Sequence, residues 1–278
     1  MIGEIVPKEV EPERILIFSG HHDSAYEFNL IKWGKGKYMI PLPVLALIPL
    51  FMILINSIWT LIYSLIFNSY RPNVIISLII NVPFFPFLVL FYFFTSKHAV
   101  LGAMDNLSAV SVCLGISKYL SENKNSQFYP KHTKVLFISF GSEEAALRGS
   151  KKFVSRHYDR IKNATLINFE SIAKKDLIKV IKKEQTAKLS DQLCKEIIKI
   201  TDQIKIKCEI RALFFGTGGT DATSFAKAGI KATTIIGQPI GPVSYYHTQD
   251  DTIDVIEKES LRYALEIALH YIKFIDNQ

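Results

Sequence analysis

The sequence predicts an α/β fold with a mainly parallel central sheet, helices on both faces, and an inserted two-helix transmembrane hairpin. Short apolar runs typical of buried strands alternate with longer stretches of helical periodicity along most of the chain. Two runs, 40–67 and 74–95, contain no charged residue. Each reaches the ~20 residues that cross a bilayer core. We therefore expect the first part of the α/β domain over 1–37, the hairpin over 38–96 and the rest of the domain over 97–278.

The elements follow from the apolar spacing and from capping residues. The first expected strand is Ile15-Leu-Ile-Phe-Ser-Gly, which ends at His21. The later expected strands are 134–140, 164–169, 177–182, 207–214 and 231–236. The expected helices run from Asp105 or Asn106 (as N-cap) to 123 and over 149–161, 186–204, 221–228 and 257–275. Strands separated by helices of this length form a parallel sheet that is covered on both faces.

The two apolar runs are separated only by 68–73, which predicts a tight turn between two helices. Pro83 and Pro86 lie inside the second run and predict a kink or break there. The alternative is a pair of buried core helices. Such helices are normally shorter and carry a polar stripe, so we favour contact with a lipid bilayer through 40–67 and 74–95.

The flanking charges predict the orientation of this hairpin. Lysines stand on both sides of it, whereas the turn carries only Arg71; the lysines are Lys32, Lys35, Lys37 and Lys97. By the positive-inside bias, a multi-pass membrane protein with its catalytic domain on the cytoplasmic side is expected. The three cysteines, Cys113, Cys194 and Cys208, show no CxxC spacing and are interpreted as reduced packing residues, which agrees with that side.

The formal net charge of +7 allows either nucleic acid or anionic lipid as a partner. A nucleic-acid surface would need clustered basic residues with interleaved aromatic side chains. The lysines of 174–183 instead fit the solvated positions of a strand. No nucleic acid is expected, and anionic lipid beside the hairpin is the more economical partner.

Histidine and carboxylate side chains follow the expected strands, where open α/β sheets bind their ligands. The candidates are His21, Asp23, Asp105, Glu143, Glu144, Glu170 and His247. Taken singly, each has an ordinary explanation as a helix cap or a solvated loop residue. Together, imidazole and carboxylate groups are the ligands that zinc accepts. Without Asp23, the two histidines and four carboxylates suffice for two metals with a bridging carboxylate, and leave one acid as a base.

Among the candidate ligands, the adjacent pair Glu143-Glu144 is the most informative about the chemistry of the site. Neighbouring carboxylates on a turn point in different directions, so one can bind metal while the other takes a proton. Asp23 stands two residues after His21 and is placed to accept the imidazole N–H and orient the ring.

Six motifs occur in a fixed order along the chain. They are Ser-Gly-His-His-Asp-Ser (19–24), Gly-Ala-Met-Asp-Asn-x-Ser (102–108), Ser-Glu-Glu-Ala-Ala-Leu-Arg-Gly-Ser (142–150), Asn-Phe-Glu (168–170), Gly-Gly-Thr-Asp-Ala-x-x-Phe-Ala-x-Ala-Gly-Ile (218–230) and Tyr-His-Thr-x-x-Asp-Thr (246–252). In this order they resemble the di-zinc aminopeptidase family, which also contains glutamate carboxypeptidase and has glutaminyl cyclases and transferrin receptors as relatives. The resemblance covers nearly the whole chain except the hairpin.

The resemblance implies two Zn²⁺ ions, a peptide substrate and a role for each matched residue. His21 and Glu170 would bind one zinc, His247 and Glu144 the other, and Asp105 would bridge them. Glu143 would be the general base and then the general acid. Asp23 would support His21, and Tyr246 would donate a hydrogen bond to the tetrahedral intermediate. Asp221 and Asp251 match family motifs in supporting positions.

Three features depart from the family pattern. Glu170 stands where aspartate is common, the hairpin replaces a modest surface loop, and the chain begins in what resembles the first strand of the sheet, so a shortened reading frame is expected. The expected activity is that of a membrane-anchored, zinc-dependent aminopeptidase. A carboxypeptidase or a glutaminyl cyclase-like enzyme on the same site remains an alternative, as does a membrane-tethered binding protein that has lost catalysis.

Overall fold

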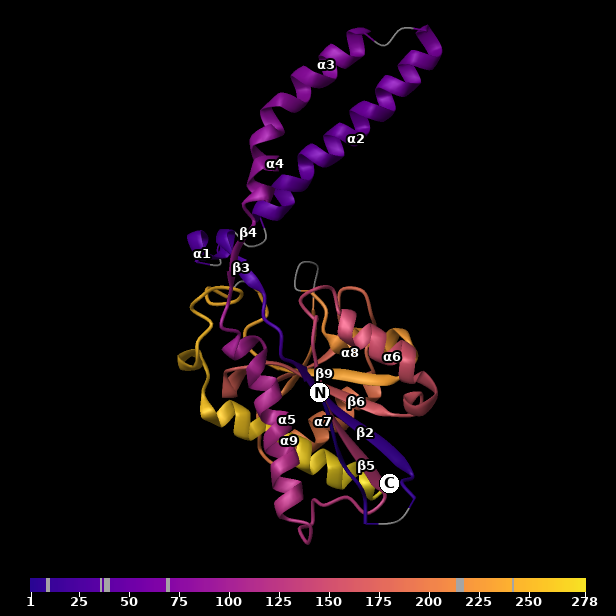
Figure 1. Ribbon diagram of the computed structural model, residues 1–278, viewed down its shortest axis with the longest axis vertical. Coiled ribbons are helices and arrows are strands. Elements are labelled where there is room, and N and C mark those ends of the chain that lie inside the picture. Colours follow the sequence, from indigo (N-terminus) through magenta and orange to yellow (C-terminus); the bar gives the residue numbers. More distant parts are fainter. Residues whose placement is uncertain (9–10, 36, 38–40, 69–70, 214–217, 242) are drawn as a thin grey trace. The chain divides into compact units, whose positions relative to one another are not determined.

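The computed structural model describes residues 1–278 except 9–10, 36, 38–40, 69–70, 214–217 and 242 (Figure 1). The chain forms two compact units. The first unit contains 1–25, 100–241 and 251–278, and the second contains 26–99 and 242–250.

The first unit is built around a seven-stranded sheet in the order β1-β5-β2-β6-β9-β7-β8. Its strands are β1 (Ile2–Ile5), β2 (Arg14–His21), β5 (Thr133–Phe140), β6 (Thr165–Ile172), β7 (Lys179–Lys183), β8 (Glu209–Ala212) and β9 (Lys231–Gly237). Strand β2 pairs in parallel with β5 and β6, β6 with β9, and β7 with β8. The pairs β1–β5 and β7–β9 are antiparallel. The prediction of an α/β fold with a mainly parallel sheet is therefore confirmed.

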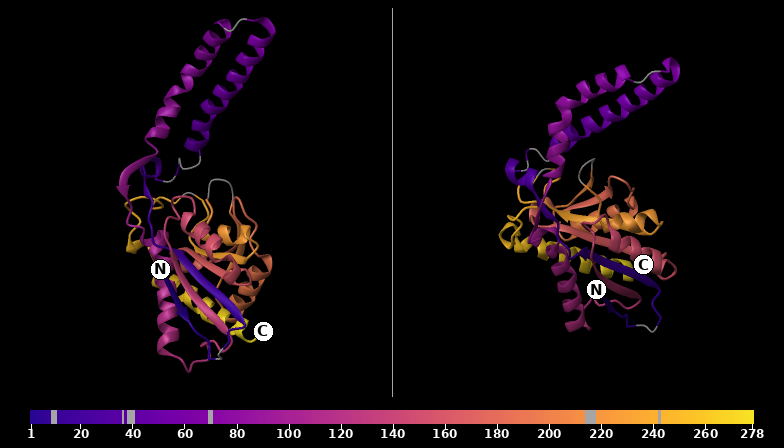
Figure 2. Two further views of the ribbon diagram at one scale, coloured as in Figure 1. Left: turned by 45° about the vertical axis from the view of Figure 1, so that its right-hand side comes forward. Right: turned by 45° about the horizontal axis from the view of Figure 1, so that its top comes forward.

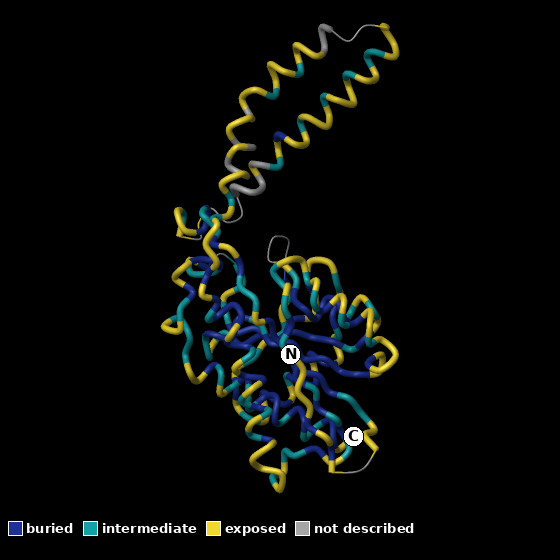
Figure 3. Tube along the Cα trace, viewed as in Figure 1, coloured by how far each residue is buried: buried dark blue, intermediate teal, exposed yellow. Residues whose placement is uncertain are grey.

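Helices cover both faces of this sheet (Figures 1 and 2). On one face lie α5 (Ser108–Glu122), α7 (Asp191–Gln203) and α9 (Lys258–Asp276), and on the other α6 (Arg148–Ile161) and α8 (Asp221–Lys227). Alternate residues of a strand point to opposite faces. Leu16 and Phe18 accordingly join the core under α5 and α9, whereas Ile17 joins the core under α6 and α8. Figure 3 shows this buried interior in dark blue.

Two helix starts differ from the sequence prediction. Helix α7 begins at Asp191 instead of 186, because the Ser190 hydroxyl caps it by accepting the Leu193 N–H at 3.2 Å. Helix α5 begins at Ser108, after a turn of π-helix, η2 (Ala103–Leu107). The expectation that Asp105 or Asn106 caps α5 is wrong: Leu107 occupies the N-cap position without a side-chain cap bond, and Asp105 and Asn106 lie inside the preceding η2 turn. Their side chains are used elsewhere, as described below.

The second unit contains the long apolar segments. Its elements are β3 (Tyr26–Phe28), α1 (Asn29–Gly34), α2 (Pro41–Phe67), α3 (Arg71–Asn81), η1 (Val82–Phe84), α4 (Phe85–Tyr92) and β4 (Thr95–Ala99). Helix α2 packs against α3 and α4. We call the segment from α2 to α4 the apolar arm (residues 41–92). Among the described residues, one stretch, Leu47–Phe67, is long and apolar enough to cross a membrane, with a mean hydropathy of 2.1.

The expected two-helix transmembrane hairpin is not supported, because the second apolar run does not form one long helix and only Leu47–Phe67 among the described residues could cross a membrane. The 3₁₀ turn η1 at Pro83 separates α3 from α4, and Pro86 stands in the first turn of α4. This break follows the position of the two prolines, because proline lacks the N–H that an uninterrupted helix requires.

Candidate metal centre

Three neighbouring parallel strands bring the candidate ligands of the first unit together. His21 is the last residue of β2 and pairs with Phe140, the last residue of β5. Glu143 and Glu144 lie in the turn that follows β5, and Glu170 lies in β6 at an irregularity of the β6–β9 register. Because β5, β2 and β6 are adjacent and parallel, their carboxyl ends meet at one edge of the sheet.

The imidazole of His21 lies at the centre of this group. Its Nε2 atom is 3.3 Å from Asp105 Oδ1, 3.3 Å from Glu170 Oε1 and 3.8 Å from Glu143 Oε2. The ring is 1% exposed. Its Nδ1 atom lies 3.0 Å from the carbonyl oxygen of Asp23. If Nδ1 donates its proton to that carbonyl, the lone pair of Nε2 faces the three carboxylates, where a cation would be bound.

The charges of this site are unbalanced without a cation. Although burial lowers the pKa of an imidazole, the carboxylates around His21, led by Glu170, raise its pKa well above the ordinary value. Burial, together with the charge of Glu170, raises the pKa of Glu143 to about 10. Burial likewise raises the pKa of Glu170 to about 8. Several buried acids around one ring are costly unless a positive charge is shared among them.

The donor atoms are close enough to share a metal ion. The side chains of His21, Asp105 and Glu170 each offer one ligand atom, and these atoms lie within 4.8 Å of one another. The same holds for His21, Glu143 and Glu144. One imidazole nitrogen with carboxylate oxygens fits zinc and does not fit a metal that requires sulfur ligands.

Two further carboxylates hold the backbone of the ligand-bearing turns. Asp23 accepts the N–H groups of Glu143 and Glu144, both at 3.2 Å, and its carboxylate lies 3.5 Å from His21 Nδ1. Although burial opposes it, the contacts with His21 and these two N–H groups keep the pKa of Asp23 below its usual value. The expected link between Asp23 and His21 is therefore made chiefly by the carbonyl oxygen of Asp23, while its carboxylate serves the Glu143-Glu144 turn.

Asp251 does for Asp105 what Asp23 does for the glutamate pair. Its carboxylate is fully buried and accepts the N–H of Met104 at 2.7 Å and of Asp105 at 3.1 Å. Its carbonyl oxygen accepts the N–H of Ala103 at 3.3 Å. Three consecutive N–H groups of η2 thus end on one residue, which fixes the backbone from which the Asp105 carboxylate projects.

His247 and Tyr246 belong to the second unit. His247 is 5% exposed and has a backbone φ of 52°. Its carbonyl oxygen accepts the Phe28 N–H at 2.8 Å, and the ring of Tyr246 stacks on its imidazole at 3.9 Å. The approach of His247 to Asp105 and Glu144 stays a prediction from the sequence.

Comparison with known proteins identifies the family. The family model described as "Peptidase family M28" matches residues 88–272. The chain belongs to peptidase family M28. A curated relative, aminopeptidase YwaD of Bacillus subtilis (strain 168), is 27% identical over 172 residues, which cover 59% of this chain and 35% of the relative. The chain thus spans about a third of that relative's length.

Two solved structures share the fold of this M28 chain. The aminopeptidase from Aneurinibacillus sp. strain AM-1 has a TM-score of 0.59 at 21% identity, covering 97% of this chain and 46% of the other. BSAP, a zinc aminopeptidase from Bacillus subtilis, has a TM-score of 0.60 at 19% identity, covering 99% of this chain and 49% of the other.

The sequence motifs of this M28 chain contain supporting residues whose roles were not predicted. Asn106 donates from Nδ2 to the carbonyl of Phe169 at 3.2 Å and accepts the Ser171 N–H at 3.0 Å. The Ser108 hydroxyl accepts the Ile172 N–H at 3.0 Å. These bonds tie η2 to β6, and so tie Asp105 to Glu170. Their positions within the motif 102–108 were a signal, but only the fold reveals which strand they contact.

Asp221 and Glu184 form a buried acidic pair beside the site. Asp221 opens α8, and burial raises its pKa to about 6. Glu184, which the sequence reasoning passed over, accepts hydrogen bonds from the Thr220 N–H at 3.0 Å, from the Thr220 hydroxyl at 2.7 Å and from the hydroxyls of Thr223 and Thr234. Glu184 therefore holds the turn that presents Asp221.

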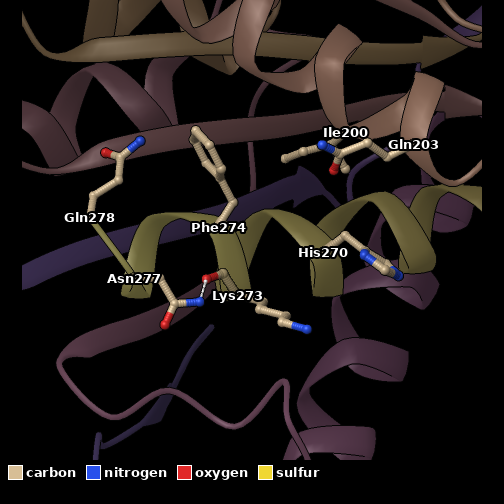
Figure 4. A pocket seen from close by; sticks show the side chains of 7 residues that line it. All are labelled: Ile200, Gln203, His270, Lys273, Phe274, Asn277 and Gln278. Atoms are coloured by element: carbon tan, nitrogen blue, oxygen red, sulfur yellow. Dashed lines mark hydrogen bonds between the residues drawn. The ribbon is translucent and has the colours of Figure 1, made fainter.

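A pocket of about 340 Å³ lies between α7 and α9 near their C-terminal ends (Figure 4). It is lined by Ile200, Gln203, His270, Lys273, Phe274, Asn277 and Gln278. The neighbouring Asp276 accepts the N–H groups of 131–133, just where β5 begins. None of the residues that line the pocket belongs to the candidate metal cluster.

Proposed function

We propose that this M28 chain is a zinc-dependent exopeptidase that removes N-terminal residues from peptides and is held at a membrane by its apolar arm. The observation that carries the catalytic part is the buried imidazole nitrogen of His21 with three carboxylates within 3.8 Å. The relatives named above as aminopeptidases, one of them as a zinc aminopeptidase, support the same reaction.

The proposed ligand set serves two zinc ions. His21 and Glu170 would hold one, His247 and Glu144 the other, and Asp105 would bridge them. Zinc bound by such donors supplies Lewis acidity that favours ionisation of a water molecule and polarises a substrate carbonyl. The fit of His21, Asp105 and Glu170 rests on their mutual distances. The assignment of His247 and Glu144 rests on the order of the sequence motifs.

Glu143 is the proposed general base. Its carboxylate lies beside the ligand cluster, and the Asp23 carboxylate holds its backbone N–H. From there Glu143 would take a proton from the attacking water and return it to the leaving amine. Tyr246 would donate a hydrogen bond to the oxygen that becomes negative during the reaction.

The test combines metal analysis with a substrate panel. Glu143→Ala is expected to keep its zinc and to lose turnover by orders of magnitude, whereas His21→Ala loses zinc. His22→Ala is the matched control, because His22 is exposed and bonds instead to the Ser139 hydroxyl. Full activity of Glu143→Ala would remove Glu143 from the role of base.

The substrate panel also separates the alternatives on the same ligand set. Aminoacyl reporters detect an aminopeptidase, N-acylated peptides with a free carboxylate detect a carboxypeptidase, and N-terminal glutaminyl peptides detect a cyclase. A zinc-loaded protein inactive on all three would support a binding protein instead.

The membrane part of the proposal rests on where polar and apolar side chains lie in the apolar arm: polar side chains face the inside of the helix pair, and apolar side chains face outward. The least exposed residues along α2 and α3 include Asn56, Thr60, Ser77 and Asn81, whereas isoleucine, leucine and phenylalanine side chains cover the outside. Figure 3 shows the arm mostly in yellow. A helix pair in water would bury its apolar side chains, so this pattern favours lipid as the surrounding solvent.

One polar side-chain contact joins α2 and α3 inside the apolar arm, where lipid offers no hydrogen-bond partner. The hydroxyls of Thr60 and Ser77 lie 3.4 Å apart across α2 and α3. The Asn56 amide nitrogen and the Asn81 amide oxygen are both buried and have no partner among the described residues. The Thr60–Ser77 contact is therefore the polar interaction on which the closed pairing of α2 and α3 rests.

Flotation with phosphatidylcholine–phosphatidylglycerol liposomes tests the anchoring. The full-length protein is expected to float, and a variant with residues 38–96 replaced by a short linker is expected to stay at the bottom. Flotation of that variant would refute anchoring by the apolar arm. The flanking lysines further suggest that the catalytic unit faces the cytoplasm.

Disulfide formation in those liposomes tests whether α2 and α3 pack against each other within one copy of the protein. Thr60→Cys/Ser77→Cys should form an intramolecular disulfide, because these hydroxyls are in contact. Ile58→Cys/Ile79→Cys, whose side chains are 49% and 66% exposed, is the matched control that should not. A dimer linked through residues 60 and 77 would show that a second copy occupies this face.

A further inference from the structure

The apolar arm is joined to its unit by a short antiparallel ribbon. Strand β3 leads into the arm and β4 leads out of it, with Tyr26 paired to Ala99 and Phe28 to Thr95. Beyond the paired residues, the Asn29 N–H donates to the carbonyl of Phe94 at 3.0 Å. We call β3 and β4 together the root ribbon (residues 26–28 and 95–99).

The segment that carries His247 is bonded to both strands of the root ribbon. On the β3 side, the Phe28 N–H donates to the His247 carbonyl at 2.8 Å. On the β4 side, Gln249 donates from Nε2 to the carbonyl of Ala99 at 2.9 Å. The Gln249 N–H also reaches Glu27 Oε1 at 3.4 Å, and the other oxygen of this buried carboxylate accepts from Lys32 Nζ at 3.1 Å.

The imidazole itself is held by a ring of the same ribbon. The Phe28 and His247 rings meet edge to face, with centroids 4.5 Å apart and an interplanar angle of 89°. Tyr246 stacks on the imidazole at 3.9 Å. The backbone of His247 has φ of 52°, a region that residues other than glycine occupy only when their surroundings hold them there.

We propose that Phe28 is a positioning residue for His247, so that the root ribbon of the apolar arm also sets the direction of one metal ligand. This inference rests on the proposed role of His247 as a zinc ligand. Its consequence is that the root ribbon both joins the apolar arm to its unit and orients a metal ligand: loss of the Phe28 ring lowers the affinity for the zinc held by His247.

Zinc titration of the full-length protein, in competition with a chromophoric chelator, tests the proposal without reference to activity. Phe28→Ala should lower one of the two zinc affinities by about tenfold or more, the usual effect of losing a group that orients a ligand. Phe28→Tyr keeps the ring and should restore the affinity. Tyr26→Ala is the matched control, because Tyr26 lies on the same strand and is 59% exposed.

Two further variants separate the possible outcomes. His247→Ala should bind one zinc instead of two, and if it still binds two, the ligand assignment fails and this proposal fails with it. Gln249→Ala loosens the same segment from β4 and should lower the same affinity, even if Phe28→Ala does not fold. If His247→Ala loses a zinc while Phe28→Ala and Gln249→Ala bind both as tightly as the unsubstituted protein, the positioning role is refuted.

Discussion

Replacing Asp251 by asparagine removes a charge from the support of Asp105 at nearly constant shape. The carboxylate of Asp251 accepts the N–H groups of Met104 and Asp105 at 2.7 and 3.1 Å in a fully buried position. Asparagine keeps one acceptor oxygen and turns the other position into an N–H₂ group that faces an N–H donor. One charge-assisted bond is lost and one buried donor is left without an acceptor.

The magnitude follows from these two hydrogen bonds. A hydrogen bond to a charged group contributes about 1.5–3 kcal/mol, so the loss of one costs about 2 kcal/mol. If the η2 turn relaxes when zinc is absent, zinc binding must order it again, and the lost hydrogen bond makes the free energy of binding less favourable by about 2 kcal/mol. This corresponds to about a thirtyfold weaker zinc affinity. Asp251→Asn should therefore bind zinc about thirtyfold more weakly while retaining its fold.

Zinc affinity and thermal unfolding are measured on the same samples, with Asp276→Asn as the matched control. Asp276 is a buried carboxylate that accepts three backbone N–H groups, at 2.8, 2.9 and 2.8 Å. These contacts lie at the amino end of β5, whereas the cluster lies at the carboxyl end. Asp276→Asn should lose stability without losing zinc affinity. The reasoning is refuted if Asp251→Asn binds zinc as tightly as the unsubstituted protein, or if Asp276→Asn weakens zinc binding equally.

Three further predictions concern stability. Although burial opposes it, the N–H groups of 131–133 keep the pKa of Asp276 below its ordinary value, so its contribution is present at neutral pH and is lost as the pH falls through the folded-state pKa. The difference in unfolding temperature between Asp276→Asn and the unsubstituted protein should therefore shrink below about pH 3.9. Removing zinc with a chelator should lower the unfolding temperature. If free zinc had been present at a hundredfold over its dissociation constant, the free energy of unfolding falls by about 2.7 kcal/mol. An unchanged unfolding temperature would argue against metal at His21. Gly20→Ala should destabilise by about 1–3 kcal/mol, because its Cβ would meet the Ala109 Cβ at 2.6 Å, whereas Gly3→Ala, with nothing within 4 Å, should be nearly neutral by denaturant unfolding.

Much of the fold was predictable because its signals are local. Apolar runs marked the strands β2, β5 and β9, and helical periodicity marked α6 and α9, with ends that differ by a few residues. The start of α7 was missed because the chain near Lys183 and Lys188 forms a β-bridge before Ser190 caps the helix, and such pairing depends on residues distant in sequence.

The supports of the candidate site were less predictable than its candidate ligands. A zinc ligand is drawn from histidine, cysteine and the carboxylates, so candidates can be recognised from the sequence. A support such as Asp251 or Asn106 acts through backbone groups, and any segment has those. Which segment it holds depends on which strands and turns lie beside it in the folded protein, and the sequence does not show this directly.

The sequence by itself determined the alternation of strands and helices, the charge-free runs and the residue types that a metal centre needs, since each depends on side-chain chemistry at known spacing. Only the tertiary structure decided that β5, β2 and β6 lie side by side, so that His21, Asp105 and Glu170 share one buried edge. It also decided that the His247 segment is bonded to the root ribbon. The physical reason is that hydrogen bonds and charge contacts act over a few ångströms of space, whatever the distance along the chain.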